Sequence, residues 1–209
     1  MKISGLKFWA DASKITGLND DDYVTTWTDA SGNSNDVTQA TESKKPKYKT
    51  NILNSLPVVR FDGSDILSGT LSLKQPHTIF VVGKTNNTSA YHTFVRHSLI
   101  ILSNVNNAYW GAYGINLVQS SGQTINAFKA ITVRARGYNA VDLYTNDSAD
   151  VTNTDGTAYR SETLALGQWN DTYYLNGDIA EVLLYDNALS SDNVTVVNNY
   201  LSKKYNITM

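Results

Sequence analysis

The sequence predicts an all-β domain, a sandwich or barrel of antiparallel strands with one helix near its C-terminal end. Short segments rich in β-branched and aromatic residues recur along the chain. Clusters of Asn, Asp and Gly separate these segments at spacings of about 8–12 residues, which is typical of sandwiches and barrels. A helical spacing of apolar residues appears only at the end. The length of 209 residues suits one large all-β domain.

The clearest strand candidates alternate with turn signals in chain order. The strands are expected at residues 78–82, 91–95, 99–102, 130–134 and 140–144. The turn clusters between and after them lie at residues 83–87, 103–107, 120–122, 146–148 and 153–156. Asn, Asp and Gly end strands there because they tolerate left-handed backbone or bond to their own main chain. Two further pairs, Asp62-Gly63 and Asn176-Gly177, predict tight turns.

The one predicted helix covers residues 190–204. Ser190 is its expected N-cap, and Asp192 near the start and two lysines at the end suit the helix dipole. An apolar stripe for docking on the sandwich is formed by Val194, Val197 and Leu201, with Tyr200 beside it.

The segment 179–185 is apolar on both faces except at Glu181, which predicts a central, covered strand. A buried carboxylate needs a partner. Arg60, inside another apolar strand, is the expected partner of Glu181 in a structural ion pair.

Composition excludes several classes of protein. The chain has no cysteine, so a disulfide framework, a cysteine nucleophile and a thiolate metal site are excluded. Lys and Arg number 17 against 19 Asp and Glu, so no basic excess is available for a nucleic-acid partner. No apolar run approaches the roughly 20 residues of a membrane span. Polar residues interrupt the first eleven positions, which predicts no signal peptide and a chain made and retained in the cytoplasm.

Three stretches resemble the concanavalin A-like lectin/glucanase superfamily, in the laminin-G-like branch found in bacterial surface proteins and bacteriophage virion proteins. They are LKFWADAS at 6–13 with WTDASGNSND at 27–36, LPVVRFDGSD at 56–65, and YLNGDIAEVLLYDNALS at 174–190 with YLSKKY at 200–205. The resemblance implies a jelly-roll sandwich of two antiparallel sheets, with the terminal helix on one side, as a single domain over residues 1–209. Fold alone does not give function.

No enzymatic activity is expected. Retaining glycosidases need two carboxylates about 5–5.5 Å apart. The Glu-x-Asp-x-x-Glu strand of laminarinase-like relatives is absent, and the odd spacing of Asp178 and Glu181 predicts opposite faces. His77, His92 and His97 lie beside no Gly-x-Ser-x-Gly elbow and are expected to be surface or half-buried residues.

Two loops carry oxygen donors of the kind that bind Ca²⁺. The candidate ligands are Asp29, Asn33 and Asp36 in one loop and Asp62 and Asp65 in the other. The same residues are also good turn formers without an ion. The fold therefore requires no cofactor, and Ca²⁺ is the one candidate.

Aromatic rings that stack on sugars, together with nearby amides, suggest a glycan site. The candidates are Tyr109, Trp110 and Tyr113, with Tyr91 and His92 from a neighbouring strand. The alternative is that Tyr109 and Trp110 straddle a strand, one inward and one outward. Trp9 and Trp27 match framework positions of the family and are expected in the core.

Two functional hypotheses remain open. The first is a bacteriophage virion structural protein, an exposed capsid decoration or a head or tail fibre subunit whose partners are other virion proteins. A recognition fold without an export signal favours this hypothesis, because virions assemble in the host cytoplasm. The second is a carbohydrate-binding adhesin for cell-surface or environmental glycans, and the two roles are compatible. A degenerate glucanase-like domain is the third alternative. None has a nucleic-acid or membrane partner.

Overall fold

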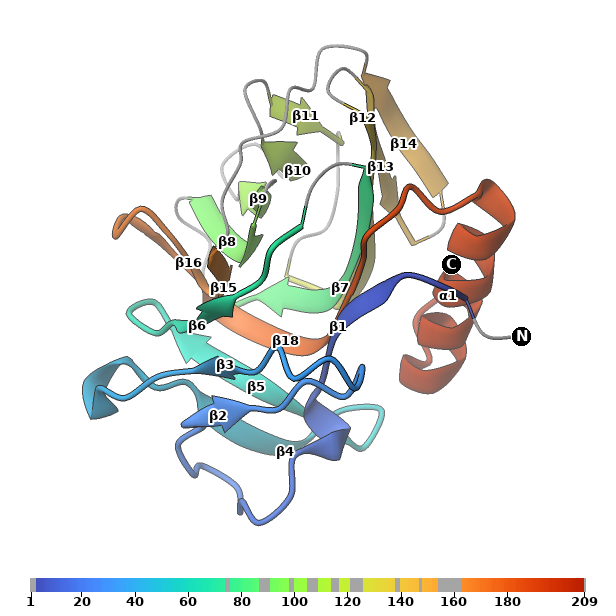
Figure 1. The fold of residues 1–209 in the computed structure, drawn as a ribbon. Coiled ribbons are helices and arrows are strands. Elements are labelled where there is room, and N and C mark those ends of the chain that lie inside the picture. Colours follow the sequence, from blue (N-terminus) through green and yellow to red (C-terminus); the bar gives the residue numbers. More distant parts are fainter. Residues whose placement is uncertain are drawn as a thin grey trace.

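The computed structural model describes residues 3–73, 76–86, 91–97, 100–104, 109–113, 117–120, 126–137, 140–146, 148–153 and 163–208. Its strands form two facing antiparallel sheets, which we call sheet A and sheet B (Figure 1). This arrangement confirms the predicted all-β sandwich with one C-terminal helix.

Sheet A has the strand order β14-β13-β12-β7-β18-β5-β4, with β1 paired to β18. Its strands are β1 (Leu6–Asp11), β4 (Lys47–Leu53), β5 (Leu56–Asp62), β7 (His77–Thr85), β12 (Lys129–Gly137), β13 (Ala140–Thr145), β14 (Ser148–Asn153) and β18 (Asn176–Tyr185).

Sheet B has the order β11-β10-β9-β8-β15-β6-β3-β2. Its strands are β2 (Thr26–Trp27), β3 (Val37–Thr38), β6 (Leu67–Thr70), β8 (Tyr91–Arg96), β9 (Ile100–Asn104), β10 (Tyr109–Tyr113), β11 (Leu117–Gln119) and β15 (Thr163–Leu166). A separate hairpin of β16 (Gln168–Trp169) and β17 (Tyr173–Tyr174) follows β15, and two 3-10 turns occupy Ala12–Lys14 and Glu42–Lys44.

β18 is central, as predicted, with β5 and β7 as its neighbours. Its residues alternate between the core shared with sheet B and the outer face of sheet A, and only the first set contacts the main core. A bulge between Ile179 and Glu181 adds one residue to this strand. The bulge turns Glu181 to the same outer face as Asp178, so the predicted opposite placement of these two carboxylates is wrong.

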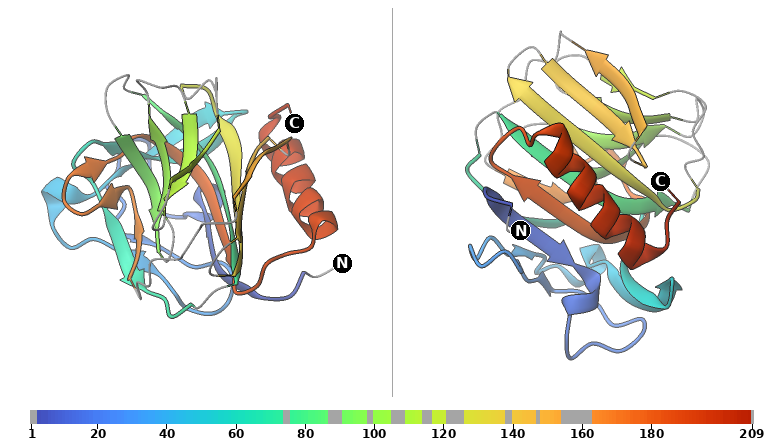
Figure 2. Two further views of the ribbon diagram at one scale, coloured as in Figure 1. Left: turned by 90° about the horizontal axis from the view of Figure 1, so that it is seen from above. Right: turned by 90° about the vertical axis from the view of Figure 1, so that its right-hand side faces the viewer.

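Helix α1 (Ser191–Tyr205) covers the outer face of sheet A (Figure 2). The Ser190 hydroxyl accepts a hydrogen bond from the Asn193 amide at 3.3 Å, which confirms the predicted N-cap. Asn206 ends the helix with a φ of 53°. The predicted stripe is buried, and the buried residues of the helix are Val194, Val197, Asn198, Leu201 and Tyr205.

The two predicted Gly turns have different outcomes. Gly63 has a φ of 103° directly after β5, as a tight turn requires. Asn176-Gly177 instead begins β18, so that prediction is wrong. A Cβ at Gly177 would collide with the Lys84 carbonyl oxygen, and this close approach of two strands is the reason for glycine there.

Among the described residues, no helix has the length and apolar character needed to cross a membrane.

Candidate functional site

Four aromatic side chains line a cavity at one end of sheet B, beside the β16–β17 hairpin. They are Tyr91 at the start of β8, Tyr113 at the end of β10, and Trp169 and Tyr173 from the hairpin. Leu117 also belongs to the part of the lining that the structure describes. The cavity measures about 210 Å³. We call it the aromatic pocket. Figure 1 shows β16 lying against β8, which brings residues distant in sequence together.

The hairpin places two of its three aromatic rings, Trp169 and Tyr173, on one side. Trp169 and Tyr173 are directly opposite each other across the two strands, so their side chains share a face. Asn170 and Asp171 form the turn with φ values of 53° and 51°, a backbone that Asn and Asp tolerate better than most residues. The local sequence therefore determines that both rings project from the hairpin together.

The rings of the aromatic pocket hold one another. The ring centroids of Trp169 and Tyr173 are 5.2 Å apart with an interplanar angle of 29°. Tyr113 lies 5.1 Å from Trp169, and Tyr91 lies 5.5 Å from Tyr173 at 73°. Tyr91 is 37% exposed, and the other three rings are half-buried. Because these contacts are favourable arrangements for aromatic pairs, the pocket is formed before any ligand arrives.

His92 supports the pocket from behind and does not line it. The side chain is 4% exposed, and its Nδ1 lies 3.1 Å from the Tyr174 carbonyl oxygen and 3.3 Å from the Asn176 amide nitrogen. Burial lowers the pKa of this imidazole, so it is neutral near pH 7. His92 therefore ties β8 to the hairpin, and its predicted role as a glycan contact is wrong.

Trp110 and Tyr109 are also internal. Trp110 is fully buried between the sheets, 5.0 Å from the ring of Phe94. Tyr109 faces the other way, is 2% exposed, and lies beneath Tyr113 and Trp169. The two residues straddle β10, so the alternative interpretation is correct and neither ring is free to stack on a sugar. Of the five predicted glycan contacts, only Tyr91 and Tyr113 lie in the aromatic pocket.

Trp169 and Tyr173 are not among the predicted glycan contacts, although the sequence carries a local signal for their hairpin. An Asn-Asp pair between aromatic residues is a hairpin signal, and the chain has this pattern at residues 169–173. That signal was present in the sequence, but nothing in it indicated that this hairpin packs against β8.

The first candidate calcium loop uses its oxygens within the protein. Oδ1 of Asp29 accepts from the amides of Trp9 and Ser31, both at 2.9 Å. Oδ2 of Asp29 accepts from the Ser31 hydroxyl at 2.8 Å and from the Asn35 amide at 3.0 Å. Asp36 accepts from the Asp29 amide at 2.8 Å, and the Asn33 amide group donates to the Leu6 carbonyl at 3.0 Å. These side chains fix the loop to β1, as the turn interpretation predicts.

The second candidate calcium loop, with Asp62 and Asp65, also uses its carboxylate oxygens in hydrogen bonds within the protein. Oδ2 of Asp65 accepts from the Asp62 amide at 2.8 Å, and burial raises the pKa of Asp65 to about 7. Within the described part of the chain, no three His, Cys, Asp or Glu residues are grouped as metal ligands. An ion would have to displace existing donors from both loops, so the candidate residues do not fit a calcium site.

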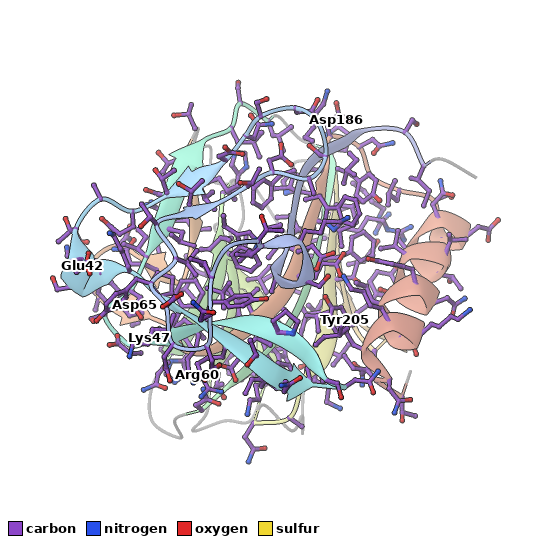
Figure 3. The ribbon with its side chains drawn as sticks, turned by 90° about the horizontal axis from the view of Figure 1, so that it is seen from below. Glu42, Lys47, Arg60, Asp65, Asp186 and Tyr205 are labelled. Atoms are coloured by element: carbon purple, nitrogen blue, oxygen red, sulfur yellow. The ribbon has the colours of Figure 1, made fainter. Side chains whose placement is uncertain are left out.

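The buried carboxylates of β18 have cationic partners, but not the predicted pairing. Arg60 binds Asp178 through two hydrogen bonds of 2.7 and 3.0 Å. Glu181 is fully buried and instead accepts from Lys204 at 2.8 Å. Figure 3 shows Arg60 well apart from Tyr205, whose hydroxyl also donates to Glu181 at 2.8 Å. The predicted need for a partner is thus correct, and the predicted Arg60–Glu181 pair is wrong because the bulge turns Glu181 toward the helix.

No protein-family model matches the sequence, and no curated protein matches it. Solved structures do match the fold. Domain 4 of a GH43 extracellular arabinanase from Geobacillus stearothermophilus, in complex with arabinotriose, has a TM-score of 0.64 at 14% identity. That match covers 93% of this chain and 98% of that chain.

Two longer chains match over a part of their length. The receptor binding domain of botulinum neurotoxin D has a TM-score of 0.67 at 12% identity, covering 94% of this chain and 53% of that chain. Trypanosoma rangeli sialidase in complex with sialic acid has a TM-score of 0.67 at 11% identity, covering 97% and 34%. These likenesses establish a lectin-like β-sandwich fold.

Proposed function

We propose that this protein is a non-catalytic glycan-binding module and that the aromatic pocket is its binding site. The observation that carries the proposal is the preformed group of four rings, with Trp169 and Tyr173 held nearly parallel. Sugar rings present C–H faces that pack on aromatic faces. A similar fold in a structure solved with arabinotriose supports the same class of ligand.

The surroundings of the pocket favour binding over hydrolysis. Retaining glycosidases need two carboxylates about 5–5.5 Å apart at the scissile bond. Among the residues that the structure describes, none that lines the aromatic pocket is acidic. The carboxylates of β18 are held by Arg60 and Lys204, and this use in ion pairs argues against a second, catalytic role.

A glycan array followed by calorimetry with the best ligand tests the proposal. Trp169→Ala should weaken binding by about tenfold or more, because it removes the central ring of the group. The matched control is Tyr23→Ala, since Tyr23 is 44% exposed and lies outside the aromatic pocket. Unchanged affinity for Trp169→Ala would overturn the assignment of the site.

We further propose that the module acts on the surface of a bacteriophage virion, as a decoration or fibre protein. The support is the motif resemblance of the sequence to that branch of the superfamily. Many copies on one particle would raise avidity by roughly 10²–10⁴ over a single site. Co-sedimentation of the protein with purified virions is the test. If the protein never sediments with particles, the proposed location on a virion is wrong, whereas the glycan-binding proposal is unaffected.

A further inference from the structure

Among the described residues, cations stand over most of the other exposed or half-buried aromatic rings and over the buried ring of Tyr205. Each pairs a Lys or Arg with a ring at a distance of 4.8–5.7 Å from the centroid: Lys14 over Trp9, Lys47 over Tyr23, Lys84 over Phe128, Arg134 over Tyr144, and Lys204 over Tyr200 and Tyr205. Within the described residues, no such cation stands over a ring of the aromatic pocket. Apart from the contacts that the four rings make with one another, no described cation occupies their electron-rich faces.

The segments that supply the described lining of the aromatic pocket carry almost no charge. The sequence has no Asp, Glu, Lys, Arg or His from residue 98 to residue 128, the stretch that supplies Tyr113 and Leu117. The hairpin adds one charged residue, Asp171, which is acidic. On β8 the basic residue is Arg96, five positions and about 17 Å of extended strand from Tyr91. An incoming cation thus meets no repulsion from a lining residue.

The rings form walls at different angles, and the space between them is small. Tyr91 is nearly perpendicular to Tyr173, and Tyr113 is tilted by 44° against Trp169. The volume of about 210 Å³ lies below the roughly 300 Å³ at which drug-sized ligand sites begin. Phenol hydroxyls and the indole N–H are the polar side-chain groups of the lining, so few groups are available to read sugar hydroxyls. The lining suits a compact head group that is recognised by ring faces.

We propose that the aromatic pocket recognises a quaternary-ammonium group carried on a glycan. The inference rests on the proposed function and names the feature of the glycan that the pocket selects. Attraction between a cation and an aromatic face within about 6 Å of the ring centroid supplies the selectivity, and it is strongest where the site excludes water. An anionic sugar finds no cation in the lining and is disfavoured.

Titration with choline and with its neutral isostere 3,3-dimethylbutan-1-ol tests the charge directly, since the two ligands have the same shape. The full-length protein should bind choline about five- to thirtyfold more tightly than the alcohol. Equal affinities, or no choline binding, would overturn the inference. Trp169→Leu keeps apolar bulk but removes the ring, so it should abolish the preference for choline, whereas Tyr23→Ala should retain it.

Two more arms separate this inference from the proposed function and from a lipid source. Neutral oligosaccharides could bind in a manner that depends on Trp169 but is not inhibited by choline. That result would support the proposed glycan binding and overturn the inference that the pocket recognises a quaternary-ammonium group. A choline-substituted polysaccharide should bind and should be displaced by free choline. Preferential binding to phosphatidylcholine vesicles over that polysaccharide would contradict the glycan as the carrier.

Discussion

At the scale of single residues, burial decides which aromatic side chain can serve recognition. Trp110 and Trp169 are both tryptophans in β-strands, yet one is fully buried and the other lines a surface cavity. The difference arises from the partner surfaces. Trp110 packs against Phe94 on the inner face of sheet B, whereas Trp169 projects from a two-stranded hairpin outside both sheets.

Trp110→Ala should therefore act on stability. Truncation of a large aromatic residue in a packed core costs about 3–5 kcal/mol. Chemical denaturation should show a loss of this size, compared with a loss below about 1 kcal/mol for Trp169→Ala, whose side chain is half-buried. Similar losses for the two variants would contradict the placement of Trp110 in the core.

Lys204 is the cation on which two buried carboxylates depend. Its Nζ donates to Asp11 at 2.6 Å and to Glu181 at 2.8 Å. Lys204→Met leaves both carboxylates without this partner, and breaking a buried pair typically costs about 3–5 kcal/mol. Lys203→Met is the matched control, because this neighbour is exposed and should change the free energy of unfolding by less than about 0.5 kcal/mol. A Lys204→Met protein as stable as Lys203→Met would show that helix α1 docks without this ion pair.

At the scale of elements, patterns that act locally were predictable and contacts between distant segments were not. The helix differs from its predicted range by one residue at each end, because the N-cap at Ser190 and the apolar spacing are local signals. All five strand candidates overlap observed strands. The bulge in β18 was not predictable, because it depends on the pairing register with β7. A prediction from strict alternation of side chains along a strand assumes that the strand has no bulge. Because the bulge was not foreseen, Arg60 was predicted as the partner of Glu181, whereas the partner is Lys204.

The histidines show the same limit. His77 and His97 are fully buried and His92 nearly so, although the sequence suggested surface or half-buried positions. For the candidate site, the sequence supplied Tyr91 and Tyr113 but not their hairpin partners. Which loop packs over a sheet end depends on three-dimensional closure, and the turn residues of the hairpin do not encode it.

The hairpin depends on His92 for its position. His92→Phe keeps a ring of similar size but removes the nitrogen that faces the Tyr174 carbonyl and the Asn176 amide. A net contribution of about 1 kcal/mol for one hydrogen bond predicts roughly fivefold weaker ligand binding together with faster amide exchange in residues 168–176. Amide exchange in helix α1 is the internal control and should not change. Unaltered exchange in the hairpin would show that ring packing alone positions it.

At the scale of the whole molecule, the two sheets have separate tasks. The outer face of sheet A is covered by helix α1 (Figure 2) and carries the buried ion pairs. The aromatic pocket lies at the end of sheet B. Substitutions in the pocket can therefore be compared without loss of the ion pairs beneath the helix. Titration of buried groups, in contrast, acts on the sandwich as a whole.

Stability should rise with pH between about 4.5 and 6.5. Burial lowers the pKa of His77 from 6.5 to about 3 and also lowers those of His92 and His97. As the pH falls, histidines in the unfolded chain bind protons before those in the folded protein do. Their contribution to the free energy of unfolding is therefore complete above pH 6.5 and is lost as the pH falls. Asp65 opposes this trend, because burial raises its pKa from 3.8 to about 7 and its contribution is lost as the pH rises. His77 and Asp65 shift by similar amounts in opposite directions, which leaves His92 and His97 to set the sign.

Asp65→Asn separates the two contributions. The amide oxygen of the substituted side chain can still accept from the Asp62 amide, but the side chain cannot titrate, so the opposing contribution disappears. Urea midpoints measured at pH 4.5, 5.5, 6.5 and 7.5 should rise with pH in the wild type and rise more steeply in Asp65→Asn. The exposed Asp192→Asn variant, at the start of helix α1, should follow the wild-type slope. If the dependence of the urea midpoint on pH is unchanged in Asp65→Asn, Asp65 is ionised across this range. If the midpoint of that variant falls as the pH rises, the buried histidines do not control the acid stability of the sandwich.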